Sequence, residues 1–287
     1  MEMAGFDEKT TREGGTPETR GKMIAVCSAK GGIGRTILSV NLAVSLSKRN
    51  HSVAVLDGDF QFGDVSLAMD LQHTFTIKEA MDGIGSLDEH RLEDYLSVHG
   101  SGVRVLPAPE RPEYADILTK EAVSKMADFL LMKHDFVVCD TGAGLNEQTL
   151  NLVEKADEIL VVATLEMAAM KNTKLLLETL DILGLRDKVR VVLNRANMES
   201  VIKAEDGARI LGEEAPIYIP NDFQTCSRSL NMGSPFVIAN AKSDIAKAVF
   251  KMAELIASNK AGEGIGKKKE NPLSLFPWKR KKGGISK

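Results

Sequence analysis

The stretch CSAKGGIGRT, residues 27–36, decides how this 287-residue chain folds. The apolar run MIAVCS leads into it, and ILSVNLAVSL, with apolar residues at helical spacing, follows it. A strand, a glycine-rich loop and a helix in this order predict a phosphate-binding loop rather than an ordinary glycine-rich turn. Gly31, Gly32 and Gly34 let backbone N–H groups converge on phosphate oxygens, and the helix N-terminus adds partial positive charge. Thr36, just inside the helix, can offer its hydroxyl to Mg²⁺.

Strands and helices alternate on either side of this loop. Apolar runs that predict strands lie at residues 23–28, 52–57, 103–108, 135–140, 158–164, 189–194 and 216–220. Helical spacing of apolar residues lies at 36–50, 121–134, 172–184 and 243–258. Methionines in a predicted loop, residues 165–171, are interpreted as core filler, with a place at a contact face as the alternative. The alternation predicts a single α/β domain, in which a mostly parallel twisted sheet carries helices on both faces.

The composition is nearly balanced in charge. The 37 basic and 40 acidic side chains leave a net charge of −3, which gives no general attraction to nucleic acid. Cys27 and Cys139 end apolar runs, so we expect reduced core thiols and a cytoplasmic protein instead of a disulfide framework. No apolar run is long enough to span a bilayer.

Aspartates follow two of the predicted strands. Asp57 and Asp59 end the strand in VAVLDGDFQFGD, and Asp140 ends the strand in DFVVCDTGAG. Ligands of open parallel sheets bind at these strand ends. An apolar strand that ends in Asp beside a phosphate loop is the Walker B arrangement, so Asp140 is predicted to hold Mg²⁺. The alternative role of each aspartate is to form a turn or cap a helix.

Polar residues also end two later strands. Asn194 and Arg195 end one of them, and Pro220, Asn221 and Asp222 end the next. The side-chain amide of Asn194 can donate to and accept from an adenine edge. The alternative is a polar strand end with no ligand.

The stretch KGGIGRT resembles the deviant Walker A motif of the MinD/ParA group of P-loop ATPases, whose pattern is Lys-Gly-Gly-x-Gly-Lys-Thr/Ser. The resemblance implies that ATP and Mg²⁺ bind and promote a homodimer, in which Lys30 reaches the partner's phosphates. It implies that Asp59 positions the attacking water and that Asp57 lies near the metal with Thr36 and Asp140. The nucleotide-binding residues that it implies are Lys30, Gly31, Gly32, Ile33, Gly34, Arg35, Thr36, Ile37, Asn194, Pro220 and Asp222.

Arg35 departs from the pattern, which has lysine at this position. A guanidinium is planar and larger than an ammonium, and is less able to act as a point charge between two phosphates. We therefore expect a catalytic set of Lys30, Asp59 and Arg35 that binds ATP and hydrolyses it slowly. The alternative is a scaffold that binds nucleotide without turnover.

Further stretches resemble particular branches of the MinD/ParA group. LDGDFQFGDVSLAMDL, VRVLPAPERPEYAD, VVLNRAN, IPNDF and SLNMGSPFVIA resemble the CpaE/TadZ branch, which places the Tad-type pilus machine, and the match covers about residues 22–258. DTGAG, with Gly142 and Gly144, resembles switch II of the flagellar-number regulator FlhG. Partners from pilus or flagellar machinery are implied. A DNA-partitioning role of the ParA kind is disfavoured by the net charge and by the lack of a basic helix face.

The chain is expected to divide into a disordered leader at 1–21, a P-loop ATPase domain at 22–260 and a flexible basic tail at 261–287. In the tail, residues 273–282, LSLFPWKRKK, combine aromatic and apolar side chains with four cations. Such a tip favours an anionic lipid surface. It predicts peripheral contact with the inner face of the cell membrane, and the alternative is a solvated tail.

Overall fold

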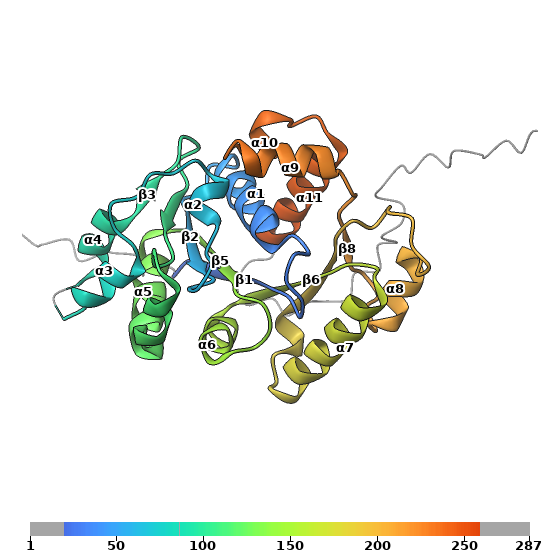
Figure 1. Cartoon of the computed structure of the whole chain (residues 1–287), viewed down its shortest axis with the longest axis horizontal. Helices are drawn as coiled ribbons and strands as arrows, with labels where there is room; N and C mark the ends of the chain where they lie inside the picture. The colour runs from blue at the N-terminus through green and yellow to red at the C-terminus, as the bar shows by residue number, and fades with distance from the viewer. Residues whose placement is uncertain (1–19, 86, 259–287) are drawn as a thin grey trace, which may run out of the picture.

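The computed structural model describes residues 20–85 and 87–258 (Figure 1). Most of the predicted leader, and the tail with its membrane tip, lie outside this part of the chain. The last two residues of the predicted leader are held by the domain. The Gly21 amide donates to the Leu131 carbonyl at 2.8 Å, and Arg20 pairs with Asp157 at 3.0 Å. Arg20 and Gly21 thus contact the domain, and the three predicted segment boundaries stay a prediction.

The sheet has eight strands in the order β3-β4-β2-β5-β1-β6-β7-β8. Their bounds are β1 Lys22–Cys27, β2 Val53–Gly58, β3 Ser97–Val98, β4 Arg104–Leu106, β5 Phe136–Thr141, β6 Glu158–Ala163, β7 Val189–Leu193 and β8 Ile217–Tyr218. All pairs are parallel except β3 with β4. The predicted mostly parallel sheet is confirmed, and each of the seven predicted strands is present. The short edge strand β3 was not predicted.

Helices cover both faces of the sheet (Figure 1). The longer ones are α1 Arg35–Ser47, α5 Lys120–Lys133, α6 Glu147–Lys155, α7 Met167–Ile182, α8 Ala204–Ile210, α9 Phe223–Asn231 and α11 Asp244–Ser258. The shorter ones are α2 Val65–Ala68, α3 Ile77–Asp82, α4 Glu89–Leu92 and α10 Phe236–Ala239, with 3₁₀ turns at Glu93–Tyr95, Pro112–Ile117 and Arg186–Lys188. None of the helices in the described part of the chain is both long and apolar enough to cross a membrane.

Each face of the sheet has its own apolar core. In β1, Ile24 and Val26 pack with α1 and α11 on one side. Met23, Ala25 and Cys27 of the same strand pack with α5, α6 and α7 on the other. Successive side chains of a strand point to opposite faces, so a central parallel strand is apolar throughout. The two-sided packing explains why MIAVC is a continuous apolar run.

Residues 167–171 were predicted as part of a loop, but they form the first turns of α7, because Met-Ala-Ala-Met-Lys consists of strong helix formers. Met170 is buried as core filler, whereas Met167 is exposed. Cys27 and Cys139 are free and buried as predicted, and burial raises the pKa of the Cys27 thiol to about 12.

Candidate functional site

The predicted phosphate loop joins β1 to α1, and two of its glycines have a left-handed backbone conformation. Gly32 has φ +73° and Gly34 has φ +98°, values that favour glycine. Gly34 is the N-cap of α1, it offers no side chain to the first N–H groups, and the first turn of the helix carries no acidic residue. These N–H groups are therefore left for an anion, which the helix dipole also favours.

Asp57 and Asp140 lie side by side where β2 and β5 end. They are register partners in the parallel pair, and both are buried. Burial raises the pKa of Asp57, and the neighbouring Asp140 charge raises it further. Burial likewise raises the pKa of Asp140 to about 6, although hydrogen bonds from Thr36 and Ser39 oppose the shift. Two carboxylates that are this poorly solvated favour a cation between or beside them.

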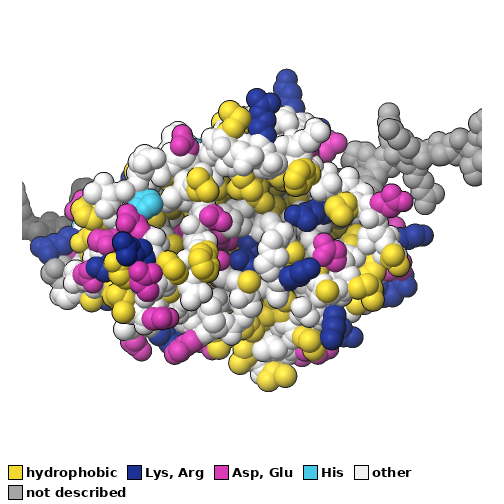
Figure 2. Space-filling model, viewed as in Figure 1, with side chains coloured by type: hydrophobic (Ala, Val, Ile, Leu, Met, Phe, Trp, Pro, Cys, Tyr) yellow, Lys and Arg dark blue, Asp and Glu magenta, His cyan; other side chains and the backbone are white. Residues whose placement is uncertain are grey.

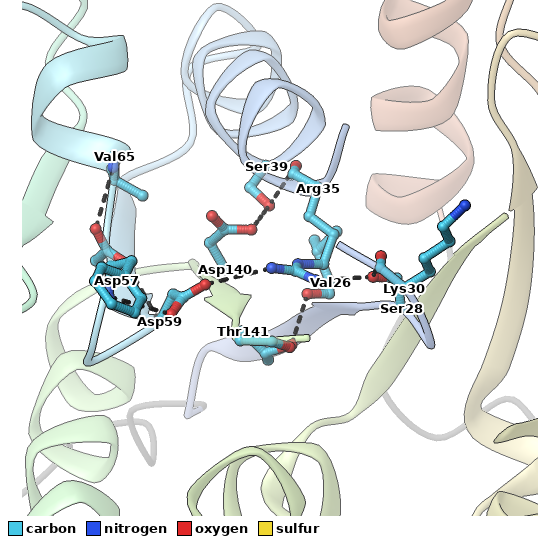
Figure 3. Close-up of polar contacts among 12 residues, drawn as sticks. Val26, Ser28, Lys30, Arg35, Ser39, Asp57, Asp59, Val65, Asp140 and Thr141 are labelled. Carbon is cyan, nitrogen blue, oxygen red and sulfur yellow. Dashed lines mark hydrogen bonds and ion pairs between the residues drawn. The ribbon is translucent and has the colours of Figure 1, made fainter. Parts of the chain in front are cut away.

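The atoms around Asp140 suit Mg²⁺. Its Oδ1 accepts a hydrogen bond from the Ser39 hydroxyl at 2.9 Å (Figure 3). The nearby Thr36 side chain, as a hydrogen-bond donor, lowers the pKa of the same carboxylate. Thr36 and Asp140 are thus neighbours, and two residues whose oxygens bind the same cation must lie close together. Over the described ranges, His, Cys, Asp and Glu form no group of three or more that could hold a metal. Mg²⁺ fits such a sparse site because it keeps water and phosphate as ligands.

Asp57 is turned toward its own loop. Its Oδ2 accepts from the Val65 amide at 3.1 Å, and its Oδ1 accepts from the Asp59 amide at 3.3 Å. A Cβ at Gly63 would lie 2.5 Å from Asp57 Oδ2, so this loop closes tightly over the carboxylate. In the structure Asp57 therefore stabilises a turn, which was the alternative role. Its predicted place near the metal stays a prediction.

Arg35 lies among the carboxylates. One of its terminal nitrogens donates to Ser28 Oγ at 2.9 Å, and the other donates to Asp59 Oδ2 at 3.3 Å (Figure 3). The carboxylate that was predicted to position water is thus paired with the residue that replaces the expected lysine. The guanidinium charge also lowers the pKa of Asp140, against the larger effect of burial.

Lys30 lies apart from these groups. Its Nζ is 3.1 Å from Glu166 Oε2, in an exposed ion pair with the N-cap residue of α7. Figure 3 shows the side chain directed away from the three aspartates. The predicted contact of Lys30 with a partner's phosphates stays a prediction. The side chain lies at the surface, and a contact with a second copy needs such a position.

Asn194, at the end of β7, supports the phosphate loop. Its Nδ2 donates to the Ile33 carbonyl at 2.8 Å, and its Oδ1 accepts from the Arg195 amide at 2.9 Å. An adenine contact would have to use the second amide hydrogen and the second lone pair, so it stays a prediction. At the end of β8, Asp222 caps α9 by accepting from the Thr225 amide at 3.0 Å.

Sequence reasoning missed three polar partners in the site, which are Ser28, Ser39 and Glu166. Ser39 follows Thr36 by three residues on α1, so helical spacing alone places both on the face toward Asp140. Ser28 and Glu166 offered no comparable signal, because their contacts join segments that are distant or irregular. The Gly144 amide also donates to the Ser28 carbonyl at 2.9 Å, which ties the DTGAG loop to the phosphate loop.

A glycine loop that leads from the central strand into a helix, with Asp140 at the adjacent strand end, defines a P-loop nucleoside triphosphatase. The chain belongs to the AAA domain family, which matches residues 21–192, and its relatives place it among P-loop ATPases of the MinD/ParA type. The septum site-determining protein MinD of Thermotoga maritima is 28% identical over 258 residues, which cover 85% of this chain and 90% of that protein.

Solved structures agree with this placement. The septum site-determining protein MinD from Pyrococcus horikoshii OT3, complexed with Mg-ADP, superposes with a TM-score of 0.72 and is 25% identical. The match covers 83% of this chain and 96% of that one. A ParA family ATPase from Chlorobium tepidum TLS has a TM-score of 0.76 at 23% identity, with 81% and 98% covered, and shows the same fold. The predicted fold class and the MinD/ParA type are thereby confirmed.

Proposed function

We propose that the protein is an ATP-binding switch, which binds Mg·ATP, pairs with a second copy and hydrolyses the nucleotide slowly. The observation that carries the proposal is the uncapped N-terminus of α1 beside the buried Asp140, whose carboxylate accepts a hydrogen bond from Ser39 of the same helix. The backbone amides of residues 31–36 would hold the phosphates, and Thr36 and Asp140 would hold Mg²⁺, which supplies charge neutralisation when it is bound. The Mg-ADP complex of the P. horikoshii relative supports both ligands.

Exposed apolar side chains around the site support pairing with a second copy. Phe62, Met167, Val201 and Phe223 follow the C-terminal ends of β2, β6, β7 and β8, and more than two thirds of each is exposed. Because the strands are parallel, these residues lie along the same edge of the sheet as the phosphate loop. Large exposed apolar side chains that gather on one side favour a protein contact. A second copy that covers this edge would bring its own Lys30 toward the nucleotide.

Turnover separates a slow switch from a scaffold. We expect Arg35→Lys to raise phosphate release severalfold, because a compact ammonium fits between the phosphates as a point charge and a planar guanidinium does not. Lys30→Ala should abolish the release if a partner's lysine is needed. The measurement is steady-state phosphate release with Asp140→Ala as the background. A wild-type rate no higher than this background would favour the scaffold, and an unchanged rate in Arg35→Lys would contradict the assigned cause of slowness.

We further propose that the switch helps to place or assemble a surface machine, of which the Tad-type pilus is the first candidate. The CpaE/TadZ-like stretches support the pilus, whereas DTGAG supports flagellar placement. Deleting the gene and counting pili and flagella by electron microscopy decides between them, and normal number and placement of both would count against the role. On the face in Figure 2, Lys and Arg are interspersed with Asp and Glu, which gives a DNA-partitioning role no support.

Residues 273–282 are proposed to contact the membrane surface. Their four cations are each worth about 1 kcal/mol beside anionic lipid, and the neighbouring aromatic side chains add apolar contact. We expect truncation after Gly266 to weaken co-sedimentation with vesicles that contain phosphatidylglycerol. Vesicles of phosphatidylcholine alone serve as the control. Equal pelleting of the full chain and the truncated chain would reject the contact.

A further inference from the structure

Arg35 joins two loops of the site that the backbone leaves separate. It is the first residue of α1, and its side chain is only 10% exposed. Through Ser28 it contacts the start of the phosphate loop, and through Asp59 it contacts the loop that follows β2. The guanidinium is planar, so it can make both bonds at once, which a compact ammonium in this place could not do with the same geometry.

Asp59 also forms a hydrogen bond within its own loop, so the ion pair with Arg35 restrains that loop. Its Oδ2 accepts from Arg35, while its Oδ1 accepts from the Phe62 amide at 3.4 Å. The loop at residues 59–64 therefore closes around a carboxylate that is itself held by the phosphate loop. Phe62, which this loop presents, is one of the exposed apolar side chains at the proposed contact edge.

The contacts of Arg35 leave one donor without a partner. Its Nε is buried and has no hydrogen-bond acceptor, although both terminal nitrogens are bonded. A buried donor without an acceptor is unfavourable, and a guanidinium that is nine-tenths buried is a strong donor to an anion. The same side chain stands at the first position of α1, where the phosphate loop would hold its anion. A phosphate oxygen there would give the guanidinium a better acceptor.

We propose that Arg35 is a lock on the nucleotide-free site: it fastens the loop at residues 59–64 to the phosphate loop, and a nucleotide phosphate competes with Asp59 for the same guanidinium. This inference rests on the proposed nucleotide binding. Arg35 is then a positioning residue with two alternative partners, which are Asp59 and a nucleotide phosphate. Part of the free energy of nucleotide binding is used to separate Arg35 from Asp59. Once Asp59 is released, it is free for the attacking water, and Phe62 is no longer held by the pair.

The test is a double-mutant cycle with a matched charge control. The affinity for the Mg²⁺ complex of β,γ-imido-ATP is measured by calorimetry in the wild type, Asp59→Asn, Arg35→Gln and the double variant. Asp64→Asn removes the same charge from the same loop, at an exposed carboxylate that makes no capping hydrogen bond. Exchange of the amides of residues 60–64 is followed by mass spectrometry without nucleotide, as a readout that does not depend on turnover.

In the Arg35 background we expect Asp59→Asn to tighten binding by about tenfold, the worth of one charge-assisted hydrogen bond, and Asp64→Asn to change it by less than about twofold. In the Arg35→Gln background Asp59→Asn should then have no more effect than Asp64→Asn. Without nucleotide, both Asp59→Asn and Arg35→Gln should speed amide exchange at residues 60–64, and Asp64→Asn should not.

Two results would overturn the lock while leaving the proposed function intact. One is equal tightening by Asp59→Asn and Asp64→Asn, which would be a general charge effect. The other is tightening by Asp59→Asn that is the same with and without Arg35. If the wild type binds no nucleotide, the proposed function has failed and phosphate does not compete for Arg35. The exchange data then show only whether the ion pair holds the loop.

Discussion

Replacing Gly34 with alanine is expected to lower the free energy of unfolding by about 3 kcal/mol and to abolish nucleotide binding. Gly31→Ala, three residues earlier in the same loop, is expected to leave the unfolding free energy of the nucleotide-free protein nearly unchanged. The two substitutions add the same methyl group. The expected difference arises only from the backbone and the neighbours of each glycine.

Gly34 has φ +98° and stands against the side chain of Asn194. A Cβ there would lie 2.6 Å from Asn194 Nδ2, the atom that donates to the Ile33 carbonyl. The strained φ costs about 1 to 2 kcal/mol, and loss of the buried hydrogen bond costs a similar amount. A Cβ at Gly31 would meet nothing within 4 Å.

Chemical denaturation of the nucleotide-free proteins measures the stability difference, and calorimetric titration with Mg·ATP measures binding. A Gly34→Ala variant with wild-type stability would show that the loop relaxes freely and that Asn194 does not support it. Asn194→Ala should reproduce part of the loss, because it removes the same hydrogen bond without changing the backbone conformation at Gly34.

The sequence predicted what depends on period and order, as the strands around the site show. Apolar runs of five to seven residues marked the strands, and alternation with helices fixed their parallel direction. Asp57 and Asp140 could then be placed at the same edge, and the structure makes them register partners. The two-residue strand β3 was not predicted, because it is too short for an alternating pattern to show. The helix α6 was not predicted either, because its sequence EQTLNLVEK carries few apolar residues.

The side-chain partners could not be predicted in the same way. Arg35 and Asp59 are 24 residues apart, and Asn194 and Ile33 are 161 residues apart. Which of several polar groups at one sheet edge pair with one another depends on rotamers and on distances of a few ångströms. The resemblance assigned Asn194 to adenine and Asp59 to water, whereas the structure shows both of them with hydrogen-bond partners within the chain.

Asp140→Asn is expected to stabilise the nucleotide-free protein by about 3 kcal/mol above pH 7, although it removes a residue of the site. Burial raises the pKa of Asp140 from 3.8 to about 6 in the folded chain. The folded state therefore binds more protons than the unfolded state between these pH values, so stability falls as pH rises through this range. As the pH falls below 3.8 the carboxyl becomes protonated in both states, and the difference between the two proteins should then vanish.

Denaturation midpoints at pH 4, 5, 6 and 7.5 give the profile, with Asp64→Asn as an exposed control that should not follow it. Mg·ATP should reverse the order of the two proteins. The wild type gains stability as ligand concentration exceeds its dissociation constant, whereas Asp140→Asn should lose the part of this gain that depends on Mg²⁺. If Asp140 served only to hold hydrogen bonds with Thr36 and Ser39, Asp140→Asn would instead lower the stability of the protein without nucleotide. Destabilisation of the nucleotide-free protein by Asp140→Asn at pH 7.5 would therefore contradict a carboxylate kept ionised for a cation.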